Sequence, residues 1–560
     1  MREILRGTRR FLSGLRPVKV PDAPARSFRD LWPGDATRGI RLMRGEFESC
    51  GTAHRLEPAE DAPKVWGVAA GTVTWRVAAH GFAWLRDLRA LGTDTARMRA
   101  RDLTEHWLEH GANQELAQAL EVAAARISAW LGHWDFLAAT AEDGFRRKLL
   151  IRLAQDARGV VSSLPAEAAH RGALVTLKGA MAAAVALEED AWMQRALRFL
   201  PGELDRQFHP DGGHVERSPS QLLLAVQDLI EIRNLLHGAG HTPPPVLAAV
   251  LERAGQALRM FRHGDGGLAL FNGTREEGAA LVDLVLTQGQ ARGRAPLLLE
   301  ESGFHRLQAG RVVVIADVGA APSGRSRDVA SGLPRGADRF AHAGTLSFEM
   351  SVGRDRLIVN CGAAPAAEAE WRDALRATAA HSTLVVQETN SAELKEAGLG
   401  RRPDRVEADR HEANGAQWLE ASHDGWRRAF GAVHRRRLYL AETGDDLRGE
   451  DVMEMQSKDT AVPAFLVRFH LHPGVVASPQ QDGEGVLLRL PSGNGWRLRA
   501  KGAKVAVEES VYLGAEARRT SQIVLQAEAG EDTIQWAIGR VPPANPGEKP
   551  TDKPAEPPEA

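Results

Sequence analysis

The chain has 560 residues, more than one compact core supports, so we expect at least two domains. Its 71 basic and 73 acidic residues leave a net charge of −2, which excludes a global field that attracts nucleic acid or an anionic membrane. The two cysteines, Cys50 and Cys361, exclude the disulfide framework of a small secreted scaffold. No stretch reaches the ~20 apolar residues of a membrane span, so no transmembrane segment is expected.

Residues 1–65 are expected to form an N-terminal arm. The start, MREILRGTRRFLSGLRPVKVPDAP, is basic but lacks the apolar run of ~7 to 15 residues that a signal peptide needs. We therefore expect a cytoplasmic protein, with the periplasm or cell envelope as the alternative. The first sixteen residues fit either a plain surface helix or a basic amphipathic helix for a membrane surface.

Residues 66–295 are predicted to form an array of antiparallel helices. Apolar residues recur there at spacings of three and four, and short breaks such as LGHWD and HGAGHTPPP separate the periodic runs. The runs cover Thr95 to Leu131, Phe145 to Leu164, Leu174 to Leu200, Leu222 to Leu236 and Val246 to Phe261.

After Glu300 the period of the apolar residues changes from 3.6 to 2. Short, β-branched runs such as RVVVIADVG, AFLVRFHLHPG and TIQWAIG alternate between apolar and polar residues and end at Gly, Pro, Asn or Asp. Residues 300–540 are therefore predicted to form an antiparallel domain of two packed sheets. The Pro-rich residues 541–560 are predicted to be disordered.

The stretch FHPDGGHVERSPSQ, Phe208 to Gln221, gathers polar residues directly before a regular helical run. His214 titrates near neutrality and suits a general base, and Glu216 could orient it or transfer a proton itself. Arg217 could neutralise a substrate carboxylate, because a guanidinium matches that geometry. The structural alternative is a turn at DGG, with Ser218 capping a helix that begins at Pro219 and both acid–base residues making structural hydrogen bonds.

Other polar positions carry weaker signals. HGDGGLALFNG, near the domain junction, offers Asp265 and Asn272 as cleft residues, although glycine-rich turns need no function. FHLH places His470 and His472 on one strand face, where they would bind a metal or join the hydrogen bonds of the sheet. Eight of the thirteen tryptophans precede residue 200, and they would either stack on sugar rings or pack in the helical core.

Three motifs resemble the heparinase II/III-like polysaccharide lyases: DGGHVERSP (211–219), AHAGTLSFEMSVGRDRLIVNCG (341–362) and AHSTLVV (380–386). With the domain order, the resemblance covers about residues 66 to 539. It implies an N-terminal (α/α) toroid followed by a C-terminal antiparallel β-sandwich, and cleavage of uronate-containing glycans by β-elimination. In that reaction a base removes the proton α to the carboxylate, a positive group neutralises the carboxylate, and an acid protonates the leaving oxygen.

The sequence departs from this family at the positions that the resemblance marks as catalytic. The family tyrosine follows the Ser-Pro pair, where this chain has Ser220 and Gln221, and the tyrosines of the chain are Tyr439 and Tyr512. The Asn-His pair expected on the preceding helix appears as Arg171 and Gly172, next to His170.

The family also often holds zinc with two histidines and an aspartate. The resemblance carries these roles to His342, Asn360 and His381, where Asn replaces the anionic ligand. Zinc is thus the one candidate cofactor, and no cofactor is certain. The two histidines would otherwise face the cleft as polar site residues.

We therefore expect a carbon–oxygen lyase acting on an acidic polysaccharide or oligosaccharide, without nucleic acid and with a homodimer as one option for the assembly. The expected catalytic residues are His214, Glu216 and His342, and the expected substrate-binding residues are Arg171, Arg217, Gln221, Asp265 and Asn272. The main alternative is a noncatalytic glycan-binding protein that kept the fold, which the missing tyrosine favours. A third reading is an enzyme with altered chemistry on an internal metabolite or cell-wall precursor.

Overall fold

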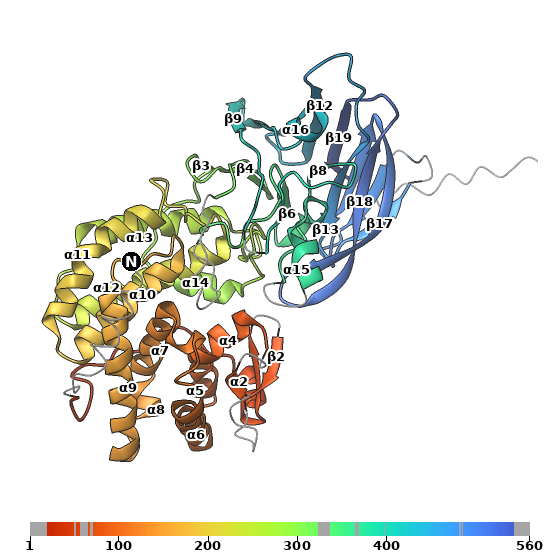
Figure 1. Ribbon diagram of the computed structural model, residues 1–560. Helices are drawn as coiled ribbons and strands as arrows, with labels where there is room; N and C mark the ends of the chain where they lie inside the picture. The colour runs from red at the N-terminus through yellow and green to blue at the C-terminus, as the bar shows by residue number, and fades with distance from the viewer. Residues whose placement is uncertain are drawn as a thin grey trace, which may run out of the picture.

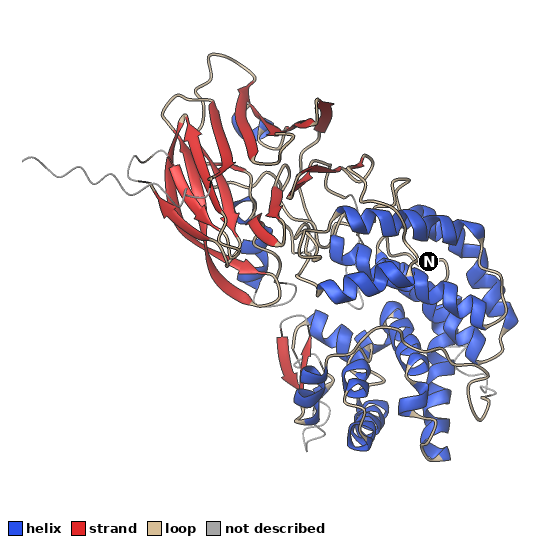
Figure 2. Cartoon of the chain, turned by 180° about the vertical axis from the view of Figure 1, so that it is seen from behind, coloured by secondary structure: helices blue, strands red, loops and turns tan. Residues whose placement is uncertain are grey.

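A computed structural model describes residues 20–49, 52–56, 65–67, 71–322, 336–364, 369–396, 398–480, 483 and 485–542. The amphipathic segment considered for the first sixteen residues and most of the predicted disordered tail, residues 543–560, lie outside them. The chain forms a helical part followed by a part built of strands, and the two lie side by side (Figures 1 and 2). Within the described ranges no helix combines the length and the apolar composition needed to cross a bilayer.

The helical part begins before the predicted array. It comprises α2 (Ala36–Met43), β1 (Glu46–Ser49), β2 (Thr52–Arg55), α4 (Val73–His80), α5 (Leu85–Ala90), α6 (Asp94–His110), η1 (Leu116–Gln118), α7 (Leu120–Gly132), α8 (Trp134–Leu137), α9 (Asp143–Ser162), α10 (Arg171–Ala186), α11 (Asp190–Gln207), α12 (Pro219–Gly238), α13 (Pro245–Met260) and α14 (Ala279–Gln288).

Two of the predicted helical runs are each divided into two helices. The run from Leu174 to Leu200 is split between α10 and α11 at Glu188, whose φ of 55° is left-handed and cannot continue a helix. The run from Thr95 to Leu131 is split where α6 ends at Gly111. A Cβ there would lie 2.5 Å from Trp107, so the glycine allows an indole to pack against the backbone. The spacing of the apolar residues does not reveal either of these helix breaks.

The helical core contains the tryptophans of the first half of the chain. Trp66, Trp75, Trp84, Trp107 and Trp130 are fully buried in one apolar cluster. They therefore pack the core, and the sugar-stacking alternative does not apply to them. The expected N-terminal arm contributes to the same cluster through Trp32, Leu42, Phe47 and Leu56, so the described part of the arm belongs to the helical domain.

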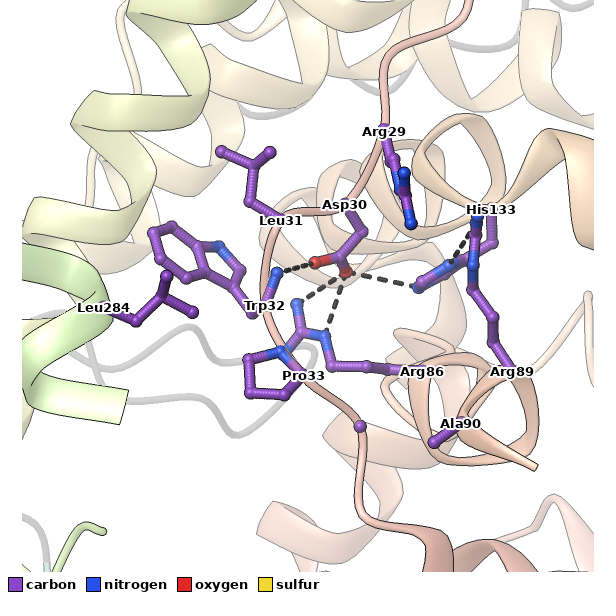
Figure 3. A pocket seen from close by; sticks show the side chains of 11 residues that line it. Arg29, Asp30, Leu31, Trp32, Pro33, Arg86, Arg89, Ala90, His133 and Leu284 are labelled. Atoms are coloured by element: carbon purple, nitrogen blue, oxygen red, sulfur yellow. Dashed lines mark hydrogen bonds and ion pairs between the residues drawn. The ribbon is translucent and has the colours of Figure 1, made fainter. Parts of the chain in front are cut away.

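The segment from Ala25 to Trp32 crosses the C-terminal ends of three helices. The Ala25 N–H donates to the carbonyl of Ala186, the last residue of α10, at 2.8 Å, and the Asp30 N–H donates to that of Gly132 in α7 at 3.0 Å. The guanidinium of Arg26 donates to the carbonyl of Gly238 in α12. Asp30 itself accepts hydrogen bonds from Arg86 and pairs with His133 (Figure 3). These contacts satisfy carbonyls that a helix end leaves without partners.

The strand part contains mainly antiparallel strands with short helices between them. It comprises β3 (Leu298–Leu299), β4 (Phe304–Ala309), β5 (Val312–Asp317), β6 (Phe348–Val352), β7 (Asp355–Val359), α15 (Ala369–Arg376), η2 (Thr378–Ala380), β8 (Leu384–Val386), β9 (Val406–Ala413), β10 (Ala416–His423), α16 (Arg427–Phe430), β11 (Ala432–Leu440), β12 (Asp446–Met455), β13 (Phe465–Leu471), β14 (Val476–Pro479), β15 (Gly485–Arg489), β16 (Gly495–Lys501), β17 (Ala503–Leu513), β18 (Ala517–Ala527) and β19 (Thr533–Arg540).

In the described ranges these strands form two sheets. An eight-stranded sheet has the order β14-β15-β16-β19-β12-β11-β10-β9. A nine-stranded sheet has the order β17-β18-β13-β7-β6-β5-β4-β3, with β8 paired to β13. A single apolar cluster contains residues of both, and the rings of Phe348 on β6 and Trp536 on β19 stack across it with centroids 5.8 Å apart. The predicted two-layer packing is thus the observed one.

Candidate functional site

The polar stretch from Phe208 to Gln221 links α11 to the first turn of α12 as a tight loop that is buried from Gly212 onward except at Val215. Phe208 and His214 form an isolated antiparallel bridge, and Gly212 has a φ of 87° that favours glycine. The Asp211 carboxylate accepts from the Gly213 N–H at 2.8 Å and from the Ser302 N–H at 2.7 Å. The predicted turn is therefore present, and Asp211 ties it to the turn between β3 and β4.

Helix α12 begins at Pro219 with Ser218 at the N-cap, as predicted from the sequence. The expected capping hydrogen bond is wrong, however, because the Ser218 side chain makes no bond to the helix backbone. Its hydroxyl lies 3.1 Å from the hydroxyl of Thr274, which comes from the segment before α14.

His214 is buried and both of its ring nitrogens are engaged. Its Nε2 lies 2.9 Å from Oε1 of Gln207, and its Nδ1 accepts from the Glu216 N–H at 3.4 Å. These contacts assign the proton to Nε2. Burial lowers the pKa of His214 to about 4, although the Glu216 carboxylate opposes this effect. The lone pair that a general base needs is directed at the protein backbone.

Glu216 is also fully buried and forms an ion pair across the domain junction. Arg339, from the segment before β6, donates through Nε to Glu216 Oε1 at 2.7 Å, and the Arg171 N–H at the start of α10 donates to Oε2 at 3.2 Å. Burial raises the pKa of Glu216, but the Arg339 guanidinium and two nearby histidines outweigh it and lower the pKa to about 2. Arg339 also reaches Oε1 of Gln221 at 3.4 Å. The structure thus brings His214, Glu216, Arg171 and Gln221 together.

A ladder of charged side chains continues from this cluster between α10 and α12. Arg171 donates to Asp228 at 2.7 Å, and Lys178 donates to Asp228 and to Glu231 at 2.6 Å each. Glu231 accepts in turn from the indole N–H of Trp32. The ladder ties the helix N-termini at the candidate site to the segment that covers the helix C-termini.

Arg217 and Asn272 hold the two domains together at the junction. Arg217 donates to the carbonyl of Ser302 at 2.7 Å and to Asp317 at 2.5 Å, and its guanidinium lies over the ring of Phe304. Asn272 donates to the carbonyl of Arg217 at 3.0 Å. Because the Arg217 side chain is only 6% exposed, the expected role of Arg217 in binding a substrate carboxylate is replaced by a structural one.

His342 and His381 lie together, but their contacts do not fit a zinc site. His342 Nε2 accepts from the Gly273 N–H at 3.0 Å, His342 Nδ1 lies 3.1 Å from His381 Nε2, and His381 Nδ1 lies 2.8 Å from the Ala377 carbonyl. With one proton on Nδ1 of each ring, all four nitrogens are occupied by hydrogen bonds. Burial lowers the pKa of both histidines, in keeping with neutral rings.

Asn360, the third expected zinc position, does not suit a zinc ion either. Its Oδ1 accepts from the Ser382 N–H at 3.0 Å, and its position supplies no anionic donor. Among the residues that the structure describes, no cluster of three or more His, Cys, Asp or Glu side chains could hold a metal ion. His342 instead belongs to the contacts at the domain junction, because its backbone N–H donates to Asn272 Oδ1 at 3.1 Å.

The remaining expected positions lie in separate contacts. Asp265 pairs with Arg356 of β7 at 2.8 Å. His470 is hydrogen-bonded inside the sandwich, with Nδ1 2.8 Å from the Ser510 hydroxyl, which agrees with the structural alternative for FHLH. His263, which the sequence did not single out, lies 2.9 Å from both Ser351 Oγ and Glu349 Oε2. All three residues of this Ser-His-Glu arrangement are buried, so it belongs to the interior of the junction.

The pocket in Figure 3 is separate from these clusters. It is lined by Arg29 to Gly34 of the N-terminal segment and by Arg86, Arg89 and His133, so none of the expected site residues lines it. Two of its three arginines are paired with carboxylates, Arg86 with Asp30 and Arg89 with Asp135. We therefore keep the Glu216–Arg339 cluster as the candidate site.

Sequence reasoning missed Arg339, Asp228, Lys178 and Asp317. Two of these carried a usable signal, because Lys178 and Asp228 are charged residues inside otherwise apolar helical runs, RGALVTLKGA and LLLAVQDLI. Buried charges of this kind require partners. The sequence signal for Arg339 was weaker, namely its position two residues before the AHAG motif.

Comparisons with known proteins agree with this architecture. A family model described as "Heparinase II/III-like, C-terminal" matches residues 291–537. The chain is 31% identical over 554 residues to "FtsZ-localized protein C" of Caulobacter vibrioides, covering 94% of this chain and 93% of that protein. Heparinase III superposes with a TM-score of 0.70 at 14% identity, covering 96% of this chain and 89% of the other. The chondroitin AC lyase of Streptomyces coelicolor A3 gives 0.52 at 10% identity, covering 90% and 78%. The predicted toroid and β-sandwich fold is thereby confirmed.

Proposed function

The chain belongs to the heparinase II/III-like family, and we propose that within this family it binds an acidic glycan between toroid and sandwich without cleaving it. The observation that carries this proposal is the state of the proton-transfer groups. His214 and Glu216 are fully buried and engaged with Gln207, Arg339 and the backbone. The positions where the family has a tyrosine hold Ser220 and Gln221.

The arginines at the edge of the cluster support binding of an anion. The side chains of Arg171 and Arg339 are 22% and 15% exposed, unlike the buried acid and histidine behind them. The Nε atoms of Arg171 and Arg275 are buried donors without a hydrogen-bond partner among the described residues. A buried donor without a partner costs about 1 to 3 kcal/mol, which a ligand carboxylate would offset.

Arg275 belongs to the same neighbourhood, because its N–H donates to the Ser220 hydroxyl at 3.3 Å. The three arginines thus come from the start of α10, from the segment before α14 and from the sandwich. A uronate chain that contacts all three would bridge the two domains.

β-Elimination of a uronate-containing glycan is the second candidate function. The specific observation in its favour is that a histidine and a carboxylate, 3.7 Å apart, lie beside arginines that suit a substrate carboxylate. For this reaction Glu216 would have to leave Arg339 and His214 would have to become accessible.

The 31% identical relative supports a place of action. That protein is named as FtsZ-localized, and it aligns along nearly the whole of this chain. We propose that this chain also localises with FtsZ. A fluorescent fusion imaged in the native cells together with FtsZ should co-localise with it; a fusion whose distribution differs from that of FtsZ would contradict this placement.

Binding without cleavage is the expected result when the purified protein meets alginate and heparinoid oligosaccharides. Calorimetry should detect binding of at least one of them, while the absorbance of the unsaturated product stays flat across pH and metal conditions. Arg339→Gln should weaken that binding at least about tenfold, because a charge-assisted hydrogen bond is worth about 1.5 to 3 kcal/mol. The matched control is Arg354→Gln, an exposed arginine of the same domain.

Two results would contradict this proposal. A rise in product absorbance that His214→Ala abolishes would establish the second candidate function instead. Binding that is lost equally in Arg339→Gln and Arg354→Gln would show that the junction does not bind the glycan.

A further inference from the structure

A row of aromatic side chains lies on the outer face of the eight-stranded sheet. Trp418 of β10 is the register partner of both His411 on β9 and Tyr439 on β11. The ring centroids of Trp418 lie 5.8 Å from those of His411 and 5.1 Å from those of Tyr439. We call His411, Trp418 and Tyr439 the aromatic row.

The aromatic row faces solvent because of the alternation along each strand. Leu419 on β10 and Leu438 on β11 point inward and are buried in the core between the sheets. Their neighbours Trp418 and Tyr439 therefore point outward, and Trp418 is 37% exposed. This contrasts with the fully buried tryptophans of the helical core. Trp418 thus presents an exposed indole between two further rings on the adjacent strands, and exposed apolar surface beside polar groups is typical of a binding surface.

The charges beside the aromatic row are balanced. Arg437 lies two residues before Tyr439 and on the same face of β11. It pairs with Glu420 at 2.9 Å and with Glu450 at 2.8 Å. Arg448, the register partner of Tyr439, pairs with Asp446 at 2.7 Å. Each exposed arginine thus has a carboxylate next to it, so this surface does not favour a polyanion. It offers hydrogen-bond donors and acceptors in alternation, next to flat apolar rings.

We propose that the aromatic row is a second binding surface, which takes the ring faces of an uncharged glycan chain. Sugar rings present C–H faces that stack on indole and phenol rings, and hydroxyl groups that both donate and accept hydrogen bonds. The arginine and glutamate side chains alongside supply both kinds of partner. A proline-rich peptide would also stack on such rings, but its prolines lack backbone N–H groups and only accept hydrogen bonds, whereas sugar hydroxyls also donate.

This surface is distinct from the junction cluster in position and in ligand. The aromatic row lies on the outer face of the eight-stranded sheet, whereas Glu216 and its partners lie where α12 begins. The junction offers arginine donors for an acidic chain, and the aromatic row offers neutral rings. The two surfaces would therefore bind differently charged segments of glycan. Binding at one surface can be lost while binding at the other is retained.

The test titrates the full-length protein with cellohexaose and with chitohexaose, up to millimolar concentrations, by calorimetry. At least one hexasaccharide should bind, and Trp418→Ala should weaken that binding at least about tenfold, as expected for the loss of a central tryptophan. Trp418→Phe should restore part of the affinity. The matched control is Trp371→Ala on α15, because Trp371 is 43% exposed. Binding of a uronate oligosaccharide should be the same in all of these variants.

Three outcomes would overturn the inference. The first is that the wild-type protein binds neither hexasaccharide. The second is that Trp418→Ala binds as tightly as the wild type while its thermal unfolding is unchanged. The third is that a proline-rich peptide binds in a Trp418-dependent way and the hexasaccharides do not.

Discussion

Replacing Arg217 with alanine is expected to lower the free energy of unfolding by about 3 to 5 kcal/mol, the cost of breaking a buried ion pair on one side. The variant loses the bonds to Ser302 and Asp317 and the stack on Phe304. The Asp317 carboxylate, 6% exposed, then stays buried without its cation. Chemical denaturation at pH 7 measures the difference.

Two further variants separate this ion pair from a general loss of charge. Arg262→Ala is the control, because Arg262 pairs with the largely exposed Asp283 and should cost at most about 1 kcal/mol. The double variant of Arg217 and Asp317 should lose less than the sum of the two single changes, since the pair is removed as a whole. An Arg217→Ala protein within 1 kcal/mol of the wild type would show that the junction does not depend on this contact.

Glu216→Gln is expected to destabilise the protein by about 3 kcal/mol at pH 7, and the loss should shrink as the pH falls. The folded protein lowers the pKa of Glu216 from 4.5 to about 2, because Arg339 outweighs the effect of burial. A lowered pKa in the folded state stabilises the protein fully above pH 4.5, and this contribution is lost as the pH falls from 4.5 toward 2. Glutamine carries no charge and lacks this contribution at every pH.

Denaturation of both proteins at pH 7 and near pH 3 tests this dependence. Glu203→Gln is the matched control, because burial raises the pKa of Glu203, so its charge does not stabilise the fold. That variant should be close to neutral at pH 7. An equal loss of stability for Glu216→Gln at both pH values would contradict the ion pair as its cause.

The fold could be predicted because its signals are local. The change of apolar period near residue 300 coincides with the first strand of the sandwich, β3, at Leu298. The start of α12 at Pro219 follows from residues within one turn of it. The two missed helix breaks depend on a left-handed Glu188 and on the packing of Trp107 against Gly111, and these are tertiary effects.

The site was less predictable, because its partners are far apart in the chain. His214 and Glu216 are neighbours in sequence and in space, and they were found together. Glu216 meets Arg339 across 123 residues, and Arg217 meets Asp317 across 100. No local pattern shows which cation neutralises which acid. From the sequence, Arg217 was therefore expected to bind a substrate carboxylate. In the structure it binds the carboxylate of Asp317 instead.

The segment that crosses the ends of α7, α10 and α12 also sets an order for folding. Arg26 reaches the carbonyl of Gly238 across 212 residues, and Trp32 reaches Glu231 across 199. During synthesis this segment leaves the ribosome before any of the helices that hold it, so it must wait until α12 has been made. Contacts between such distant residues form late, because closing a long loop costs entropy. The N-terminal segment is thus among the first parts of the helical domain to be synthesised and among the last to dock.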